Sequence, residues 1–175
     1  MRIILNAGHT ISGAGSGAVG FINESEETRK AVNAVKRYLQ MKGHSVVVVN
    51  VDKARSQSAY LYSVARQANA HGADLFVSIH FNAGGGQGAE CYTWKGKKTA
   101  AAVGVCEELN KLGFRNRGIK DGSHLYVISK TTMPAVLVEI CFVDNRLDVE
   151  LYKKKGVNIV AQAITRGILK KGIDK

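Results

Sequence analysis

The chain reads Ser45-Val46-Val47-Val48-Val49-Asn50-Val51 between two amphipathic segments, and this stretch decides the fold class. Its consecutive β-branched residues predict a strand that is covered on both faces, because no alternating polar residues mark a face turned to water. The flanking segments, about 24–41 and 58–70, carry apolar residues at the spacing of amphipathic helices. A buried strand between two such helices is typical of an α/β layer fold.

The same alternation of short apolar runs and amphipathic segments continues along the chain. Strands are predicted at 2–6, 45–51, 75–81, 89–94, 125–128 and 135–142. Helices are predicted at about 24–41, 58–70, 98–111, 146–154 and 157–170, and Asn23 followed by Glu26 forms a capping box for the first of them. Because the 175 residues show no internal repeat or linker, they predict one α/β domain with a six-stranded sheet and about five helices.

Composition excludes several classes of protein. Hydrophobic residues make up 45% of the chain and charged residues 22%, which excludes a disordered or collagen-like protein. No apolar run approaches the roughly 20 residues that cross a bilayer, so no membrane insertion is expected. The apolar stretch at the N-terminus is too short for a signal peptide, and we therefore expect a cytoplasmic location. The three cysteines contain no C-x-x-C pair and cannot form a closed disulfide framework, so we expect reduced thiols.

The net charge of +11 is the one unusual bulk property of the chain. Such an excess favours polyanions as neighbours, such as nucleic acid, an anionic membrane surface or a phosphate-bearing polymer of the cell wall. The basic residues are spread along the chain, however, and a solvated face that maintains solubility explains them equally well. Charge alone therefore does not select a function.

Chemically reactive side chains lie near the ends of several predicted strands. The first strand leads into His9, the third contains His80, and the last contains Glu139 among apolar residues and a thiol. Glu24 follows the cap of the first helix, where a loop returns the chain to the sheet. Because open α/β sheets gather reactive groups at the carboxyl ends of their strands, this placement favours a common site.

Two imidazoles and one carboxylate at such an edge suit a single zinc ion, with a fourth position for water. On this interpretation His9, Glu24 and His80 hold Zn²⁺, and Glu139 is the free carboxylate that takes a proton from water. The sequence has no H-E-x-x-H motif, so structural alternatives stay open: hydrogen-bonded core histidines, and Glu139 as the buried partner of a basic group. His124, in a polar loop, could line a cleft.

The glycine-rich segment 15–20 satisfies the pattern G-x-G-x-x-G, and Asp52 follows the valine-rich strand. This is the outline of a dinucleotide-binding fingerprint. Gly15, however, comes nine residues after Asn6 rather than directly out of the strand, and the helix cap falls three residues past Gly20. We therefore interpret the segment as a loop that carries the chain from one candidate ligand to the next.

Four motifs carry a resemblance to a known family. They are Gly8-His9-Thr10, Gly20-Phe21-Ile22-Asn23-Glu24, Ser78-Ile79-His80-Phe81-Asn82-Ala83 and Val138-Glu139-Ile140-Cys141-Phe142-Val143-Asp144-Asn145. Together, in this order and across nearly the whole chain, they resemble the zinc-dependent N-acetylmuramoyl-L-alanine amidases of the amidase-3 type. The resemblance is strongest to the catalytic domains of bacteriophage endolysins.

The resemblance implies both a site and a reaction. His9, Glu24 and His80 match the zinc ligands, Glu139 matches the catalytic glutamate, and Asn82 matches a position that lines the substrate groove. The implied fold is a twisted, mostly parallel six-stranded sheet flanked by helices. The implied reaction is hydrolysis of the amide bond between N-acetylmuramic acid and L-alanine in peptidoglycan. In that reaction Glu139 takes a proton from the attacking water and passes it to the departing amine.

The resemblance also implies partners and a domain assignment. Residues 1–175 would form the catalytic domain, without the C-terminal wall-binding module of endolysins, and would act on the wall after release from the cytoplasm. Peptidoglycan is the expected partner, the basic surface could bind anionic wall polymers, and no nucleic acid is expected. Asn6-Ala7 replaces an acidic residue of many relatives, which leaves the second contact of His9 open. The alternatives are a non-catalytic module that binds cell walls or polyanions, and a zinc peptidase or deacetylase.

Overall fold

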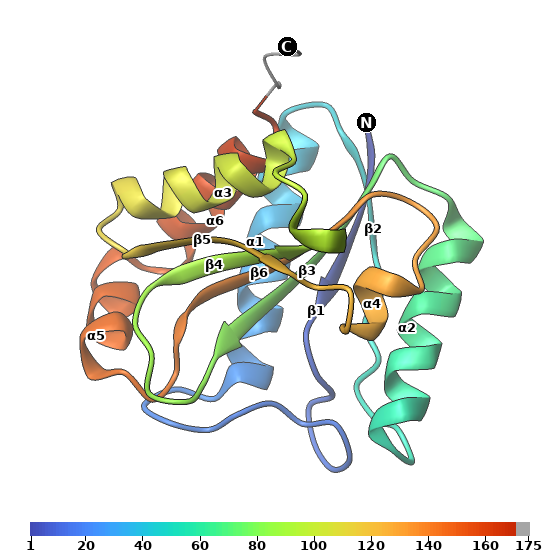
Figure 1. The fold of residues 1–175 in the computed structure, drawn as a ribbon, viewed down its shortest axis with the longest axis horizontal. Helices are drawn as coiled ribbons and strands as arrows, with labels where there is room; N and C mark the ends of the chain where they lie inside the picture. Colours follow the sequence, from blue (N-terminus) through green and yellow to red (C-terminus); the bar gives the residue numbers. More distant parts are fainter. Residues whose placement is uncertain (171–175) are drawn as a thin grey trace.

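A computed structural model describes residues 1–170 of the chain, which form a single domain around one mixed sheet (Figure 1). The order of the strands in the sheet is β2-β1-β3-β6-β4-β5. All neighbouring strands are parallel except β4 and β6, which are antiparallel. The strands are β1 (Arg2–Ala7), β2 (Ser45–Val48), β3 (Leu75–Asn82), β4 (Ala89–Thr93), β5 (Asn116–Asp121) and β6 (Ala135–Phe142). The prediction of a mostly parallel six-stranded sheet is therefore confirmed.

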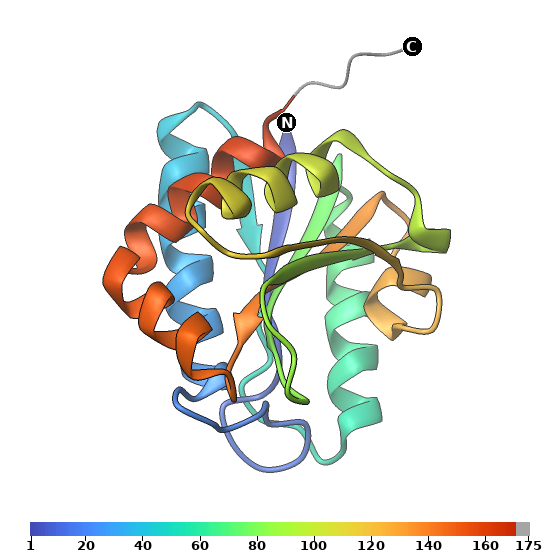
Figure 2. The same cartoon turned by 60° about the vertical axis from the view of Figure 1, so that its left-hand side comes forward.

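Helices cover the sheet in two layers, one on each face. The first layer consists of α1 (Glu24–Met41), α3 (Ala100–Lys111), α5 (Arg146–Lys155) and α6 (Val157–Ile168). The second layer consists of α2 (Gln57–His71) and the short α4 (Tyr126–Ser129). Figure 2 shows α1, α5 and α6 on one side of the sheet and α2 and α4 on the other. A short 3₁₀ helix, η1 (Trp94–Gly96), follows β4.

Side chains of the central strands alternate between the two layers, as the period of a strand requires. On β3, Val77 and Ile79 pack in the core of the first layer, whereas Phe76 packs in the core of the second. On β6, Val138 belongs to the first core and Leu137 to the second. This alternation directs the polar residues further along both strands toward the second layer, which covers less of the sheet.

One predicted strand is wrong, and the strand predicted at 45–51 is shorter and less covered than expected. β2 ends at Val48, and at the edge of the sheet Ser45 is exposed and the three valines are only half-buried. Residues 125–128 were expected to form a strand, but Leu125 is the N-cap of α4, and the remaining strand of the sheet is β5. The apolar residues Val127 and Ile128 are buried in the core of the second layer, which explains their strand-like composition. β5 reads Asn-Arg-Gly-Ile-Lys-Asp and lies at the edge of the sheet, where one neighbour suffices and polar side chains remain in water. With α4, residues 1–170 contain six α-helices, where about five were predicted.

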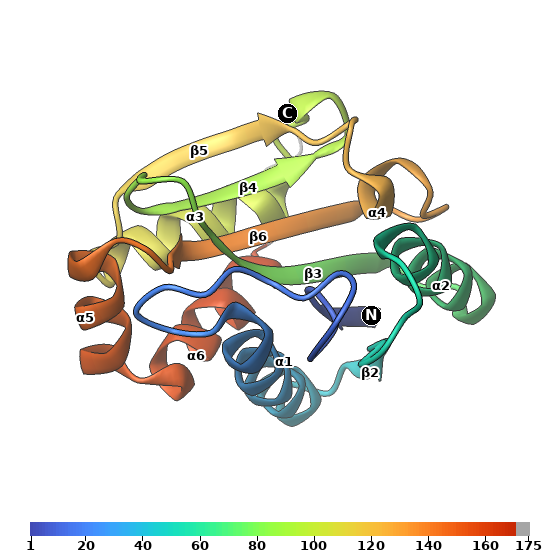
Figure 3. The same ribbon diagram turned by 90° about the horizontal axis from the view of Figure 1, so that it is seen from below.

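The start of α1 is the feature of the fold that matters most for the site. The side chain of Asn23 accepts a hydrogen bond from the backbone N–H of Glu26 at 3.4 Å, so the predicted cap is confirmed. Glu24 is therefore the first residue of the helix, and the helix begins beside β3 (Figure 3).

Among residues 1–170, none of the helices has the length and apolar character that crossing a bilayer requires.

Candidate metal centre and active site

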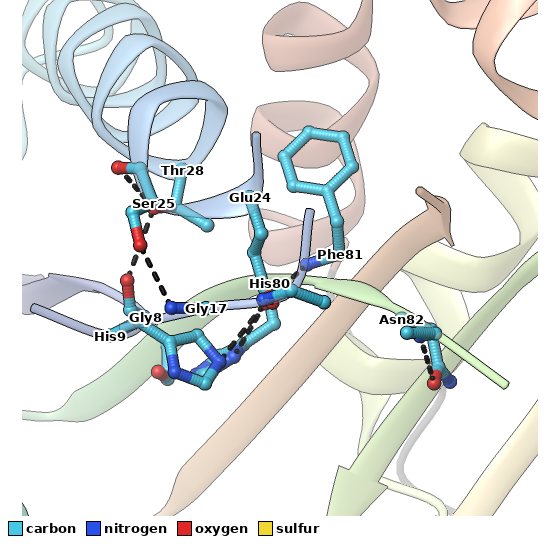
Figure 4. Close-up of polar contacts among 12 residues, drawn as sticks. Gly8, His9, Gly17, Glu24, Ser25, Thr28, His80, Phe81 and Asn82 are labelled. Carbon is cyan, nitrogen blue, oxygen red and sulfur yellow. Dashed lines mark hydrogen bonds and ion pairs between the residues drawn. The ribbon is translucent and has the colours of Figure 1, made fainter. Parts of the chain in front are cut away.

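Three polar side chains from separate parts of the chain converge at the carboxyl ends of β1 and β3. His9 follows β1, His80 lies near the end of β3, and Glu24 begins α1. Glu24 Oε1 lies 3.2 Å from His9 Nε2 and 3.2 Å from His80 Nδ1 (Figure 4). The candidate donor atoms of the three residues all lie within 4.8 Å of one another. The structure thus brings together the three residues that were predicted as ligands.

Close backbone packing positions His80 in this cluster. The N–H of Gly8 donates to the carbonyl of Ile79 at 2.9 Å, which joins the end of β1 to β3. A β-carbon at position 8 would lie 2.3 Å from the imidazole of His80, well inside van der Waals contact. Glycine at position 8 is therefore required for the ring to occupy its place beside the chain.

Arg29 of α1 holds the backbone that carries His9. Its Nη1 atom donates to the carbonyl of Gly8 at 3.3 Å, and its Nη2 atom donates to the carbonyl of His9 at 2.8 Å. His9 has a φ of 68°, a left-handed conformation that is uncommon outside glycine. Asp52, which accepts from Nε and Nη2 of the same guanidinium, fixes Arg29 in turn. These contacts stabilise a backbone turn that presents the imidazole to Glu24.

The glycine-rich segment supplies the outer contacts of the cluster. His9 Nδ1 lies 3.0 Å from the carbonyl of Gly15, so the other nitrogen, Nε2, is free to face Glu24. Ligand histidines in metal sites commonly donate their second nitrogen to a carbonyl in this way. Glu24 Oε2 accepts from the N–H of Ala18 at 3.0 Å, and Oε1 accepts from the N–H of Phe81 at 3.0 Å. The segment 15–20 therefore serves His9 and Glu24, and a backbone carbonyl is the second contact of His9 that the sequence left open.

The electrostatics of the three residues favour a carboxylate between two imidazoles. Burial would raise the pKa of Glu24, but hydrogen bonds from His80 and His9 outweigh burial and hold the pKa well below its usual range. Burial lowers the pKa of His80, and Glu24 opposes this shift only in part. Burial also acts to lower the pKa of His9, but the hydrogen bond and charge of Glu24 raise it. Glu24 is therefore ionised at neutral pH, and the buried ring of His80 is neutral.

The donor set fits a zinc ion. Zinc bonds to imidazole nitrogen and carboxylate oxygen are about 2.0–2.2 Å long, so adjacent donors around a tetrahedral ion lie about 3.3 Å apart. The two contacts of 3.2 Å to Glu24 Oε1 match that separation. A neutral imidazole and an ionised carboxylate are also the protonation states that metal binding requires.

Glu139 lies next to this cluster on β6. It is the register partner of His80 on β3, so both side chains project from the same face of the sheet. Its Oε2 atom is buried and has no hydrogen-bond partner among residues 1–170. Burial raises the pKa of Glu139, and the negative charges of Glu24 and Glu90 raise it further. The interpretation of Glu139 as the partner of a buried basic group therefore finds no support in the described part of the chain.

The raised pKa of Glu139 leads to a prediction for metal-free protein. The folded state holds the proton of Glu139 more tightly than the unfolded chain, so above the ordinary value of 4.5 the stability contributed by this group falls as pH rises. Glu139→Gln removes the ionisable group and is expected to raise the free energy of unfolding by about 1–3 kcal/mol at pH 7. The gain should vanish toward pH 4, which thermal unfolding between pH 4 and 8 measures. A gain that is independent of pH, or one shared by the exposed-site control Glu150→Gln, would contradict this assignment.

A cavity of about 530 Å³ opens from the cluster toward the second layer. His9, His80 and Glu139 lie in its wall at one end, and Tyr92, Tyr126 and other residues of β4, α2 and α4 continue the wall. His124 also lines the cavity, as the sequence suggested for a cleft. The cavity places the candidate metal centre and the free carboxylate of Glu139 in contact with the same space.

Asn82 occupies a different position from the other predicted site residues. It does not belong to the cavity wall, and its Nδ2 atom donates to Glu90 Oε1 at 2.8 Å. Its role in substrate binding stays a prediction. Glu90 and its partner Arg117 were missed by the sequence analysis. An acidic residue within the predicted apolar strand 89–94 was the available signal, because the same criterion identified Glu139.

Comparisons with known proteins agree with this geometry. A family model described as N-acetylmuramoyl-L-alanine amidase matches residues 3–170. The endolysin of Bacillus phage SPP1 is 35% identical, over 94% of this chain and 63% of that protein. The N-acetylmuramoyl-L-alanine amidase CwlM of Bacillus licheniformis is 34% identical, over 95% of this chain and 65% of that protein. The chain therefore spans less than two thirds of the length of either curated relative.

A solved structure matches the whole domain. The catalytic domain of the CD27L endolysin targeting Clostridia difficile superposes with a TM-score of 0.91 at 30% identity, and the match covers 99% of both chains. The fold and the site define the class of this chain: a single-domain α/β protein with a candidate metal centre at the carboxyl edge of its sheet. Within that class, the chain belongs to the N-acetylmuramoyl-L-alanine amidase family.

Proposed function

We propose that this chain is the catalytic domain of a zinc-dependent hydrolase that cuts the amide bond between N-acetylmuramic acid and L-alanine in bacterial peptidoglycan. The observation that carries the proposal is the position of Glu139: it lines the same cavity as His9 and His80 of the donor set, and its buried Oε2 atom has no hydrogen-bond partner within residues 1–170. A carboxylate kept without a partner is costly to the fold unless it serves a reaction. The family membership and the likeness to an endolysin catalytic domain support the choice of substrate.

Different residues of the chain would bind the metal ion and transfer the proton. His9, Glu24 and His80 would hold the zinc ion. When bound, zinc acts as a Lewis acid that polarises a carbonyl and lowers the pKa of water. Glu139, without a hydrogen-bond partner in residues 1–170 and in the wall of the same cavity, is placed to accept a proton from the attacking water and to release it again.

Proton transfer through Glu139 balances the hydrolysis. The oxygen of water forms a bond to the lactyl carbonyl carbon, and the bond from that carbon to the nitrogen of L-alanine breaks. The proton that Glu139 removes from water passes to this nitrogen, which leaves as a neutral amine.

The basic character of the chain would serve a second purpose. With a net charge of +11, the domain would bind to anionic polymers of the cell wall.

Mass spectrometry of peptidoglycan digested by the zinc-loaded protein tests the proposal. We expect peptides with a free L-alanine amino terminus and glycan strands with a free lactyl carboxyl group. Digestion by Glu139→Gln under the same conditions is the control, and it should release neither product above background. Cleavage within the peptides would indicate a peptidase, loss of acetyl groups a deacetylase, and sedimentation with walls without any release a binding module. Each of these three results would overturn the proposed reaction.

A further inference from the structure

The face of the sheet that carries Glu139 continues over β4 and β5, beyond the reach of the second layer. α3 packs on the opposite face of these two strands, in the core of the first layer. In the described part of the chain, α2 and α4 pack on each other, and α4 packs on β6. Figure 3 shows β4 and β5 on the side of the sheet remote from α2. The outer face of β4 and β5 is thus a surface of side chains that adjoins the active site.

Register places this surface beside Glu139. Glu90 of β4 is the antiparallel partner of Glu139, so their side chains project from the same face. Tyr92, two residues further along β4, lines the cavity together with Glu139, and its parallel partner on β5 is the exposed Lys120. With strands about 4.8 Å apart, side chains of β5 begin about 10 Å from those of β6. That separation is within reach of a peptide of two or three residues.

Arg117 of β5 is held rigidly on this surface. Its Nε atom donates to Glu90 Oε2 at 2.7 Å, and its guanidinium lies 5.0 Å from the centre of the Phe142 ring. Glu90 is itself buried, with 3% of its side chain exposed, and also accepts from Asn82 and Tyr92. Within residues 1–170, the Nη1 and Nη2 atoms of Arg117 make no hydrogen bond, and 31% of the side chain is exposed. The terminal edge of a fixed guanidinium is therefore available to a ligand, and it is the part of arginine that binds carboxylates in a bidentate manner.

Other cations near the site cannot serve the same purpose. The described lining of the cavity contains no lysine or arginine, so apart from the proposed metal ion the cavity offers a carboxylate no basic side chain beside Glu139. Arg29 uses its donors on the backbone of Gly8, His9 and Ser25 and on Asp52. Among the cations considered, only Arg117 combines a fixed position with terminal donors that make no hydrogen bond within residues 1–170.

We propose that Arg117, with Lys120 three residues further along β5, forms a carboxylate subsite for an acidic residue of the peptide whose amide bond is cut. The inference rests on the proposed function and adds to it the orientation in which the substrate lies across the sheet. The peptide runs from Glu139 across β4 to β5, and the sugar occupies the cavity between α2 and α4. Arg117 acts as a binding and specificity residue, because its charge recognises the peptide and takes no part in proton transfer.

Two synthetic substrates test the subsite. One is N-acetylmuramoyl-L-alanyl-D-glutamate, and the other is the same compound with both glutamate carboxyl groups converted to amides. We expect the zinc-loaded protein to favour the acid over the diamide by about tenfold or more in kcat/KM, mainly through KM. Arg117→Gln should remove this preference, and Arg117→Lys should keep part of it, because lysine retains the charge without the bidentate geometry. Lys120→Gln, at an exposed position that does not affect folding, should reduce the preference by about threefold.

Controls separate recognition from folding. Arg115→Gln removes an exposed arginine just before β5 and should leave the acid-to-diamide ratio unchanged. The double variant Glu90→Gln, Arg117→Gln removes the buried charge together with its partner, and it should lose the preference even where Arg117→Gln alone is unstable. Equal rates on both substrates for the natural sequence, or an equal loss on both in Arg117→Gln, would overturn the subsite and leave Arg117 as the neutralising partner of Glu90.

Failure of the proposed function gives a different result. If neither substrate is cut, the dissociation constants of L-alanyl-D-glutamate and of its diamide are measured by calorimetry on the same zinc-loaded protein. Tighter binding of the acid that Arg117→Gln abolishes would support the subsite without the reaction. Equal binding, or no binding of either peptide, would overturn the subsite.

Discussion

Glu139→Gln is expected to lower the rate of peptidoglycan hydrolysis by about 10²–10⁴-fold, while the protein keeps its zinc. Glutamine has nearly the same shape as glutamate but cannot accept a proton from the attacking water. Glu139 is absent from the convergent set of His9, Glu24 and His80, so the ligands of the ion stay in place. Turbidity clearance of cell walls measures the rate, and elemental analysis of the same sample measures the zinc.

The matched control for this variant is Glu150→Gln, which makes the same chemical change on the exposed face of α5. The control should clear walls at the normal rate. Near-normal clearance by Glu139→Gln would remove Glu139 from its assigned role. Loss of zinc together with activity would instead make Glu139 a ligand. The same variant is expected to stabilise the metal-free fold at pH 7. A loss of activity in Glu139→Gln would therefore not come from unfolding, and it would report the loss of the proton acceptor.

His80→Ala is expected to weaken zinc binding by more than about 100-fold. Removal of a residue that only supports a metal ligand already costs about 10–100-fold in affinity, and a ligand itself contributes more. The ring of His80 supplies Nδ1 at 3.2 Å from Glu24 Oε1, and no other histidine in the described part of the chain joins the cluster with His9. Zinc content after dialysis against a weak chelator, measured by elemental analysis, reports the change.

The control for His80→Ala is His71→Ala, which removes an exposed histidine at the end of α2. This variant should bind zinc like the natural sequence. Loss of the ring removes a group against which Gly8 packs directly, so the fold of His80→Ala has to be checked. Circular dichroism serves as this check. Full zinc content in a folded His80→Ala protein would exclude His80 from the ligand set and would leave its contact with Glu24 as a structural one.

Much of the fold was predictable because local patterns of apolar residues indicate which segments are buried. The runs in β1, β3 and β6 are apolar on both faces, and the helices α1, α3 and α6 bury apolar faces, so local patterns indicate each of them. β5 was missed because its residues Asn116–Asp121 form no apolar run, whereas β2, at the other edge of the sheet, carries consecutive valines. The short α4 was mistaken for a strand because a segment of four residues, of which Val127 and Ile128 are buried, is too short to show a helical period.

The candidate site was predictable in part for a related reason. Glu139 is conspicuous because a carboxylate inside an apolar strand is costly, and His9 and His80 lie where strands approach their carboxyl ends. Glu24 joined the same hypothesis because it follows the cap of the first helix, where the chain returns to the sheet. The family resemblance, which the comparisons confirm, added Asn82. Glu90 carries a local signal of the same kind as Glu139, an acidic residue within a predicted strand, and was overlooked. Its partner Arg117 lies 27 positions away on a neighbouring strand, and no local pattern marks that pairing.

The sequence by itself determined which segments are buried, where α1 begins and which polar residues stand among apolar ones. Each of these properties depends on neighbours within a few positions, where the period of a helix or strand acts. Only the tertiary structure decided that His9, Glu24 and His80 converge, that Glu139 Oε2 has no hydrogen-bond partner within residues 1–170 and that Arg117 is held by Glu90. Those facts follow from the strand order β2-β1-β3-β6-β4-β5 and its register, because pairing of distant strands sets the distances between their side chains.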